Sequence, residues 1–379
     1  MNALHFGAGK IGRGFIGAQL SQAGFKVTFA DTETSVVEAI NRNKSYNVHI
    51  LGESYSVQKV EGVQAVVADS QHCVDSFISA DIVTTAVSMN ALPALAPIVA
   101  RGLAARYKAG VVEPLNIICC ENGIRATLSF KSMVVQRLDS ALCDWVDRYI
   151  GFVDCCVDRI VPVVTLENPL DVAVEPFYEW CLDSSAIKGE IKSISSVRLV
   201  DNIDAYIYRK LFTLNTAHCT IAYLGALKGY KYIHEAVVDA DIRSVVEGVM
   251  EECSRMVVEM YHFSAEEQAN YCSKILQRFS NSALGDTVSR VSRDPMRKLS
   301  PQLYFSRPIS LALQLGHRVH YLATAVAAVL HFRSDNDPQS LQIGDIISQN
   351  GVEYCVKRIC DIYDEDTVAE IVARYRAIF

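Results

Sequence analysis

The chain has 379 residues, of which 50% are hydrophobic and 21% are charged, and its formal net charge is −7. This length is sufficient for two domains with a full core each, and the negative charge gives no reason to expect nucleic acid or an anionic membrane as a partner. No stretch of about 18 apolar residues is present, and no signal peptide is recognisable before the strand-like residues that start at Ala3. We therefore expect a cytoplasmic protein, in which the scattered cysteines are free buried thiols.

The segment Leu4–Asp31 has the pattern of one β-turn-α-β unit, with the glycine motif Gly7-x-Gly9-x-x-Gly12 between a strand and a helix. A pyrophosphate binds well at such a helix N-terminus, because unpaired amides and the helix dipole favour an anion there. The first glycine permits the tight turn, the second lets phosphate approach the backbone, and the third lets helix and strand pack closely. The segment therefore predicts a dinucleotide site. The residues expected to form it are Ala3, Gly7, Ala8, Gly9, Lys10, Ile11, Gly12, Arg13 and Gly14.

The carboxylate of Asp31, at the end of the second strand, indicates which dinucleotide is bound. A carboxylate there accepts hydrogen bonds from a ribose diol and repels a 2′-phosphate, and no arginine follows it. We therefore expect NAD rather than NADP. Two alternatives stay open at this point, namely FAD and a glycine-rich turn in an unrelated α/β protein.

The rest of the first half continues to alternate between strand and helix signals, which predicts a doubly wound parallel sheet of the Rossmann type. Strands are expected at Lys26–Asp31, Val63–Ala68, Asp81–Val87 and Leu115–Cys120, a hairpin at Tyr46–Leu51 and Tyr55–Val60, and helices at Thr34–Asn43, Val74–Ser79 and Leu92–Lys108. We expect two further runs, Gly151–Pro162 and Leu170–Leu182, to extend the sheet. Ligands lie beyond the carboxyl ends of such strands. The residues expected to line the cofactor cleft there are Thr85, Ala86, Val87, Ser88, Glu121 and Asn122.

Long helical patterns replace the strand signals after about residue 200. They are expected at Tyr206–Leu227, Tyr232–Phe263, Ala265–Arg278, Ile309–His331 and Thr367–Ala377. We place the boundary in the Ser-rich stretch Ile191–Asn202, which gives an NAD-binding domain at 1–195 and a mostly α-helical substrate-binding domain at 196–379. An active site is expected in the cleft between the two domains.

Lys210, Asn215 and His218 are polar residues on a largely apolar helix pattern, and on an α-helix they fall within an arc of roughly 140°. Oxidation of an alcohol needs a base at the hydroxyl, which a lysine among apolar residues can supply. An amide such as Asn215 can donate to the developing alkoxide, and a histidine can hold a substrate hydroxyl. Taken alone, however, the lysine also fits a surface salt bridge and the histidine a satisfied core residue.

The pattern K-x-x-x-x-N-x-x-H, behind a dinucleotide-binding unit and within a helical domain, resembles the polyol-specific long-chain dehydrogenase/reductase family. The segments ALHFGAGKIGRGFIG, DIVTTAV, LNIICCEN, GFVDCCVDRIVP, RKLFTLNTAH, RDPMRKLS and HFRSDNDP also resemble that family and occur in its order. Within the family they fit best the members that oxidise D-mannitol 1-phosphate to D-fructose 6-phosphate with NAD. The resemblance covers nearly the whole chain.

The resemblance implies a role for each matching residue. Lys210 corresponds to the general acid/base, Asn215 and Asn122 to groups that hydrogen-bond the reacting oxygen, and His218 to a substrate contact, while no metal takes part. Asp158 and Arg159 correspond to the family's Asp-Arg pair near the active site. The chain departs from the family pattern in carrying Ser88 where glycine is usual and Tyr208 where an acidic residue is expected.

A sugar phosphate needs arginine or lysine to offset about two negative charges. The densest basic segment is Arg293–Lys298, and we take Arg297, Lys298 and Arg333 as the phosphate-binding candidates. The alternative for each of them is a solvated surface cation. We expect a monomer acting on a sugar-alcohol phosphate. Two alternatives are an NAD-dependent dehydrogenase of an unphosphorylated polyol or hexuronate, and a dinucleotide-sensing protein without turnover.

Overall fold

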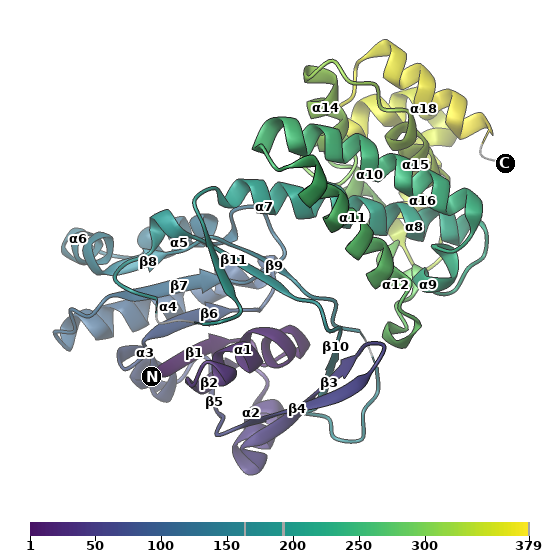
Figure 1. Ribbon diagram of the computed structural model, residues 1–379. Coiled ribbons are helices and arrows are strands. Elements are labelled where there is room, and N and C mark those ends of the chain that lie inside the picture. The colour runs from purple at the N-terminus through teal and green to yellow at the C-terminus, as the bar shows by residue number, and fades with distance from the viewer. Residues whose placement is uncertain (163, 192–193, 378–379) are drawn as a thin grey trace. The chain divides into compact units, whose positions relative to one another are not determined.

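The computed structural model describes residues 1–162, 164–191 and 194–377, so that two residues of the predicted Ser-rich boundary, Lys192 and Ser193, lie outside the described residues. The chain divides into two compact units, Met1–Ile207 and Tyr208–Phe379 (Figure 1). The first unit includes the strand β12 (Val197–Val200), which follows the predicted boundary at residue 195.

A six-stranded parallel sheet in the order β5-β2-β1-β6-β7-β8 forms the centre of the first unit (Figure 1). Its strands are β1 (Asn2–Phe6), β2 (Lys26–Asp31), β5 (Gln64–Val67), β6 (Ile82–Thr85), β7 (Leu115–Cys119) and β8 (Ile150–Phe152). Residues 2–6 of β1 pair with β2 on one side, and residues 3–6 pair with β6 on the other. The order reverses direction at β1, which places the glycine motif at the topological switch point where ligands bind in such sheets. The predicted Rossmann-type sheet is therefore confirmed.

Both faces of this sheet are covered, which explains why its strands are continuous apolar runs. Leu4 and Phe6 of β1 point into one hydrophobic cluster, whereas Ala3 belongs to the cluster on the opposite face. The helices of the first unit are η1 (Gly12–Gly17), α1 (Ala18–Gln22), α2 (Thr34–Asn43), α3 (Gln71–Ile78), η2 (Met89–Ala91), α4 (Leu92–Lys108), α5 (Ala126–Val135), α6 (Ser140–Tyr149) and η3 (Ser184–Ala186). The helix α7 (Ile203–Arg209) begins in the first unit and ends in the second. Residues of η1, α1 and α2 contribute to the cluster with Ala3, and residues of α3 to α6 contribute to the other.

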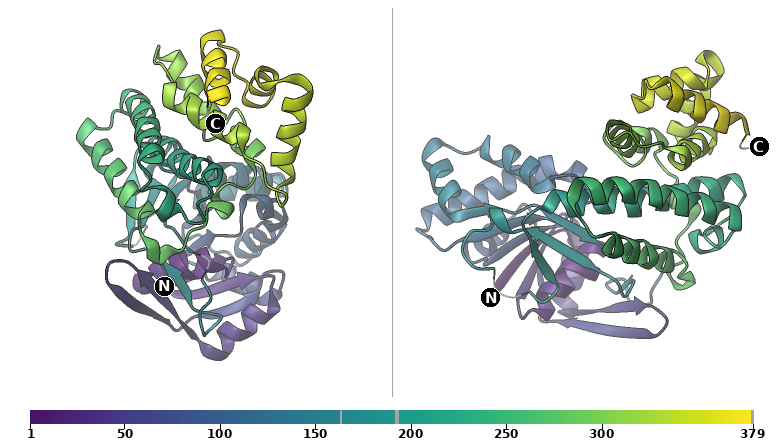
Figure 2. Two further views of the ribbon diagram at one scale, coloured as in Figure 1. Left: turned by 90° about the vertical axis from the view of Figure 1, so that its right-hand side faces the viewer. Right: turned by 45° about the horizontal axis from the view of Figure 1, so that its top comes forward.

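The expectation that residues 151–162 and 170–182 extend the main sheet is wrong beyond Phe152. These residues instead form two separate three-stranded sheets, in the orders β10-β3-β4 and β12-β11-β9. Their strands are β3 (Ser45–Leu51), β4 (Tyr55–Glu61), β10 (Val172–Val174), β9 (Cys155–Asp158) and β11 (Glu179–Asp183), together with β12. Figure 2 shows β3 and β4 as the long antiparallel ribbon that the hairpin pattern predicts. An apolar run identifies a strand but not its neighbours, which is why the sequence did not separate the three sheets.

The second unit contains helices throughout its described residues (Figure 2). They are η4 (Lys210–Asn215), α8 (Thr216–Leu227), α9 (Ile233–Ala236), α10 (Ala240–Tyr261), α11 (Ala265–Phe279), η5 (Ser282–Leu284), α12 (Val288–Val291), α13 (Pro295–Leu299), α14 (Ser306–Gln314), α15 (His320–His331), α16 (Pro338–Asn350), α17 (Val352–Cys355), η6 (Val356–Cys360) and α18 (Glu365–Ala377). The single helix predicted at Ile309–His331 is wrong, because Gly316 adopts a φ of +76° and separates α14 from α15. A left-handed glycine just after the last turn is a common helix stop.

His5 is a fully buried histidine in the central strand of the main sheet. Its Nδ1 lies 2.7 Å from Thr84 Oγ1, and its ring meets the edge of Phe29. Burial lowers the pKa of His5 from 6.5 to about 3, with a small opposing contribution from the Gly7 backbone. The side chain is therefore neutral in the folded protein over the whole range in which an unfolded histidine gains its proton.

This difference predicts acid sensitivity of the first unit. The unfolded chain binds a proton at position 5 below pH 6.5 and the folded chain does not, so the free energy of unfolding falls as the pH falls toward 3. At pH 5 the loss from this group is about 2 kcal/mol. We expect a His5→Gln variant to lack that loss, so chemical denaturation at pH 7 and pH 5 should show a smaller decrease for the variant. An equal decrease in both proteins would contradict the prediction.

Candidate active site

Three glycines give the turn after β1 its shape. Gly7 has a φ of +97°, and a Cβ atom on it would lie 2.5 Å from the Ala86 carbonyl oxygen. A Cβ on Gly12 would lie 1.9 Å from the Gly7 oxygen, so no side chain fits there. A Cβ on Gly9, in contrast, would meet no described atom within 4 Å. The first and third glycines are thus required by packing, and the second leaves open space next to the backbone at the start of a helix, where an anion can approach.

The carboxylate of Asp31 is hydrogen-bonded to the glycine turn. The Ala8 amide donates to Asp31 Oδ2 at 2.6 Å, and the Glu33 amide donates to Oδ1 at 2.9 Å. A carboxylate has about four acceptor positions, so Asp31 keeps capacity for a further donor such as a ribose hydroxyl. Lys10 and Ile11 are exposed on the first helical turn. This arrangement suits an adenosine diphosphate moiety that runs from the carboxylate across the turn.

Ala3, Arg13 and Gly14, which the sequence assigns to the same site, are buried within the first unit. The Arg13 guanidinium donates to the Leu170 carbonyl at 2.9 Å and also to the Ala8 carbonyl. A Cβ on Gly14 would lie 2.9 Å from a methyl group of Val174. These contacts hold η1 and the turn in place. The side chain of Arg13 therefore stabilises the turn from the buried side and does not face the proposed nucleotide site.

Arg159 also packs against η1. Its Nη1 donates to the Gly14 carbonyl at 3.2 Å, and its guanidinium lies 5.8 Å from the centre of the Phe15 ring. Burial lowers the pKa of Arg159 to about 10, with Glu175 opposing the shift. The side chain therefore stays cationic at neutral pH. Its neighbour Asp158 is buried at the end of β9.

Glu121 joins the ends of β6 and β7. Its buried carboxylate accepts hydrogen bonds from the Thr85 hydroxyl at 2.8 Å and from the Val87 amide at 2.9 Å. Burial raises the pKa of Glu121, while these two hydrogen bonds oppose the rise. The Ala86 amide in turn donates to the Phe6 carbonyl of β1. The loops after β1, β6 and β7 thus form a continuous edge, as the positions of the polar residues in the sequence predict.

Ser88 has an unusual backbone conformation in this edge. Its φ is +93° and its ψ is 152°, a region that is open almost entirely to glycine. The sequence resemblance leads us to expect glycine at this position, and the chain has a glycine-like conformation there although the residue is serine. Backbone strain of this kind costs about 1–3 kcal/mol and is concentrated at ligand-binding sites.

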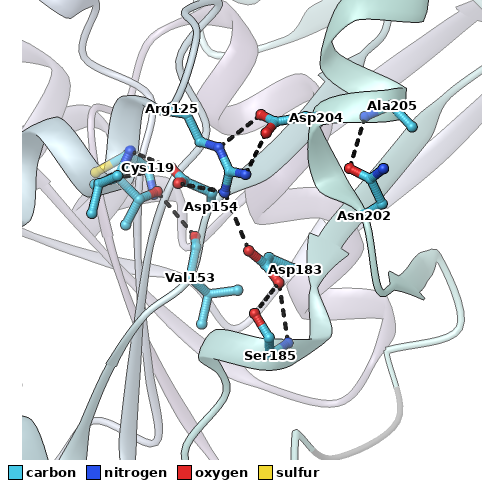
Figure 3. Close-up of polar contacts among 11 residues, drawn as sticks. Cys119, Arg125, Val153, Asp154, Asp183, Ser185, Asn202, Asp204 and Ala205 are labelled. Carbon is cyan, nitrogen blue, oxygen red and sulfur yellow. Dashed lines mark hydrogen bonds and ion pairs between the residues drawn. The ribbon is translucent and has the colours of Figure 1, made fainter. Parts of the chain in front are cut away.

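A cluster of four charged side chains supports the loop that carries Asn122 (Figure 3). Arg125 binds Asp204 through two hydrogen bonds of 2.8 and 2.7 Å, and it lies 3.4 Å from Asp154 and 3.3 Å from Asp183. Asp154 also caps α5 by accepting from the amides of residues 127 and 128. Arg125 therefore connects the loop after β7 to the first turn of α7. The exposed Asn122 is three residues before this arginine.

Lys210, Asn215 and His218 are distinguished by their exposure. In the fully described segment 209–225, every other residue is buried and these three are partly exposed. The turn Lys210–Asn215 is a π-helix. In a π-helix each backbone hydrogen bond joins residues i and i+5, so residues five positions apart are separated by little more than one turn. The side chains of Lys210 and Asn215 therefore point in more similar directions than they would on an α-helix. His218 is the i+3 neighbour of Asn215 on α8. The three side chains thus share one side of this helical segment.

Asp286 is a partner of His218 that the sequence analysis did not identify. His218 Nε2 lies 2.9 Å from Asp286 Oδ2, and Arg290 donates to Asp286 Oδ1 at 2.8 Å. Burial lowers the pKa of His218, although Asp286 opposes the shift. Burial on its own would raise the pKa of Asp286, but the hydrogen bonds from His218 and Arg290 outweigh this effect and lower that pKa below its usual value. The histidine is therefore neutral at neutral pH and donates through Nε2, which leaves Nδ1 as an acceptor.

The other departure from the family pattern, Tyr208, belongs to an aromatic stack. Its ring lies 5.3 Å from the ring of Phe212 and 5.8 Å from that of Tyr261. The side chain therefore packs within the second unit in place of the expected acidic group.

Two of the three basic candidates for phosphate binding act electrostatically on residues 218 and 219 of α8. The charges of Arg290 and Lys298 both lower the pKa of His218, and Arg297 acts in the same way on the neighbouring Cys219 thiol. Arg297 is exposed, whereas Lys298 is buried and its ammonium lies 5.3 Å from the Tyr223 ring. Burial lowers the pKa of Lys298. Arg290 of α12 thus contacts Asp286, the partner of the histidine, and the Lys298 ammonium of α13 donates to the Val291 carbonyl next to Arg290.

Arg333, the third candidate, has different neighbours. Its Nη1 donates to the carbonyl oxygens of Leu330 and Phe332, and its guanidinium packs over Gly344 of α16. The sequence placed Arg333 in the same group as Arg297 and Lys298, and the contacts place it at the junction of α15 and α16.

Across the described residues, no group of three or more His, Cys, Asp or Glu side chains is arranged to hold a metal ion. In the same part of the chain, none of the helices has the combined length and apolar character that a membrane crossing requires.

Two family models together match nearly the whole chain. The mannitol dehydrogenase Rossmann domain matches residues 1–196, and the mannitol dehydrogenase C-terminal domain matches residues 202–379.

Solved structures are similar over the same length. A Pseudomonas fluorescens mannitol 2-dehydrogenase, in a ternary complex with NAD and D-mannitol, is 18% identical with a TM-score of 0.79, and the match covers 100% of this chain and 92% of that one. A D-sorbitol dehydrogenase in substrate-free form is 16% identical with a TM-score of 0.83, covering 99% and 92%. A D-mandelate dehydrogenase is 15% identical with a TM-score of 0.52, covering 87% and 97%. At these identities the likeness shows a shared fold.

The strain at Ser88 predicts that a glycine there stabilises the protein. Removing about 1–3 kcal/mol of strain, against the 0.5–1 kcal/mol that glycine costs in chain entropy, leaves a net gain of about 1 kcal/mol for Ser88→Gly. Chemical denaturation measures it. Ser79→Gly is the matched control, since Ser79 has an ordinary φ of −92° and its replacement should destabilise. A loss of stability in Ser88→Gly would contradict the prediction.

Proposed function

Because the chain belongs to the mannitol dehydrogenase family, we propose that it oxidises a sugar-alcohol phosphate, D-mannitol 1-phosphate, at C5 to D-fructose 6-phosphate, reversibly and with NAD⁺ as the hydride acceptor. The observation that carries the proposal is the helical segment 209–225, where an amine, an amide and a neutral imidazole are the three partly exposed side chains among buried ones. These are the group types that the oxidation of a secondary alcohol needs.

Each of these groups has a separate task in the proposed reaction. Lys210 takes the proton from the C5 hydroxyl as the hydride leaves C5, and it returns a proton in the reverse direction. Asn215 donates to the developing alkoxide through its amide, and Asn122 contributes in the same way. His218 accepts a hydrogen bond from a neighbouring substrate hydroxyl at Nδ1, because Asp286 holds its other nitrogen at 2.9 Å.

The first unit is proposed to hold the nucleotide. Gly9, Lys10 and Ile11 present backbone amides to the pyrophosphate at the start of the helix, and Asp31 accepts from the adenosine ribose. The edge of Thr85, Ala86, Val87, Ser88 and Glu121 lies beside the nicotinamide in this proposal. Bound NAD⁺ would supply the hydride acceptor. The reaction requires the nicotinamide ring and the substrate carbon to be in contact, and this contact is a prediction.

The phosphate is proposed to bind beside His218. Arg290 binds Asp286, the partner of His218, and Lys298 donates to the Val291 carbonyl next to Arg290. Arg297, the neighbour of Lys298, is exposed and adds a further cation. A phosphate carries nearly two negative charges at neutral pH, and arginine binds it well because of its paired donors. Asp158, Arg159 and Arg333 are the further substrate-binding candidates, each with the contacts described above.

The lysine is tested by replacement with alanine. We expect Lys210→Ala to lower kcat by about 10²–10⁴-fold or more, because the base is lost, while the affinity for NADH is unchanged. Lys228→Ala is a matched control, since Lys228 is at the other end of α8, bound to Asp239 and Asp241, and it should leave kcat unchanged. Steady-state kinetics and fluorescence titration with NADH measure both. Wild-type kcat in Lys210→Ala would contradict the mechanism, and a wild-type protein that binds NADH but turns over no polyol or ketose would favour a dinucleotide sensor.

The substrate is tested by comparing mannitol with mannitol 1-phosphate. We expect a strong preference for the phosphate ester, and we expect Arg297→Met to raise its KM by about tenfold or more, the equivalent of one charge-assisted hydrogen bond of 1.5–3 kcal/mol. The KM for free mannitol should not change. If Arg333→Met raises the KM instead, the phosphate binds at the end of α15. A wild-type preference for free mannitol would reject the phosphorylated substrate.

A further inference from the structure

The π-helical turn between Lys210 and Asn215 is held by side chains from outside the turn. The Thr216 hydroxyl lies 3.1 Å from the Leu211 carbonyl oxygen, five residues before it, and 2.6 Å from the Tyr304 carbonyl oxygen. A π-turn displaces backbone carbonyls from their ordinary partners, and Thr216 supplies a replacement donor. Such turns are rare and frequently lie at functional sites.

Gln268 of α11 holds the turn from a second direction. Its Nε2 donates to Thr213 Oγ1 at 3.0 Å, and Thr213 lies inside the turn, between the lysine and the asparagine. Thr213 is fully buried and Gln268 is 1% exposed, so water does not compete for this bond. The same Nε2 also donates to Ser254 Oγ on α10 at 3.0 Å.

Gln268 is a poor choice for stability alone. Among the described residues its Oε1 has no hydrogen-bond partner, although it is buried. A buried acceptor without a partner costs about 1–3 kcal/mol, so an apolar side chain of the same length would suit the position better in a core. The presence of an amide at this position is explained by the hydrogen bond that its Nε2 donates to the Thr213 hydroxyl in the turn.

We propose that Gln268, through its hydrogen bond to Thr213, is a positioning residue for the reaction. It fixes the π-turn and thereby the relative directions of Lys210 and Asn215. Gln268 itself touches neither substrate nor cofactor in this account. The proposal rests on the function proposed above, in which Lys210 and Asn215 both contact the reacting oxygen.

The test uses a pair of substitutions at Thr213 in the full chain. Thr213→Ser keeps the acceptor hydroxyl, and Thr213→Val keeps the shape but removes it. We expect Thr213→Val to lower kcat by about 10- to 100-fold, as a misplacement of about 1 Å does, with little change in the KM for substrate or in NADH affinity. Thr213→Ser should keep a kcat within about twofold of the wild type. The combination of Thr213→Val with Gln268→Met should lower kcat no further than either change alone, because both remove the same bond.

Ser254→Ala is the matched control, because it removes the other hydrogen bond of the same Gln268 nitrogen and should leave kcat unchanged. A wild-type kcat in Thr213→Val, or an equal loss of kcat in Ser254→Ala, would overturn the proposal. Should Thr213→Val not fold, Gln268→Met gives the same comparison with Ser254→Ala. A Lys210→Ala enzyme that keeps wild-type kcat would instead reject the proposed function, so the two failures are distinguishable.

Discussion

The catalytic account depends on one local departure from regular helix geometry, the i→i+5 hydrogen bonding of residues 210–215. On a regular α-helix, Lys210 and Asn215 would differ in direction by about 140°, so their side chains would point to well-separated parts of the helix surface. The wider turn brings their directions together and leaves His218 on the same side. The residues Leu211–Leu214 inside the turn are buried, so packing in the core holds the turn in place as well as hydrogen bonds do.

The first unit achieves a comparable arrangement by different means. Its parallel strands end at one edge, and the loops that follow them are joined by backbone and carboxylate hydrogen bonds, such as those of Asp31 and Glu121. Close packing at Gly7 and Gly12 leaves no room for a side chain in the turn after β1. Ser88 retains a conformation that suits glycine. A continuous, hydrogen-bonded edge of this kind can hold a nucleotide in one orientation.

Local pattern was sufficient to predict most of the fold. The glycine motif and the runs of apolar residues predicted the Rossmann-type sheet, since strand identity and parallel pairing follow from short-range signals. The partners of the later strands were not predictable, because β9 and β11 pair with each other through contacts that an apolar run does not specify. The break at Gly316 was missed for a different reason, since a single glycine inside a helical pattern is often tolerated and does not by itself mark the end of a helix.

The candidate site was predictable to a different degree. Residue types singled out Lys210, Asn215 and His218 as candidates, and their roles stay a prediction. The π-turn could not be read from their spacing, because it depends on Thr216 and on Gln268, which is more than fifty residues away in sequence. Asp286 was missed for the same reason, since it reaches His218 only through the fold. The grouping of Arg333 with Arg297 rested on composition alone, and their neighbours differ.

A crystal structure of the protein with NADH and fructose 6-phosphate tests the central claim most directly. The account predicts that the C2 carbonyl oxygen of fructose 6-phosphate, which corresponds to the C5 hydroxyl of mannitol 1-phosphate, lies within hydrogen-bond distance of both Lys210 Nζ and the Asn215 side-chain amide. The C2 carbon should face the nicotinamide ring. A substrate bound elsewhere, or an amine directed away from that oxygen while the nucleotide occupies the glycine turn, would contradict it.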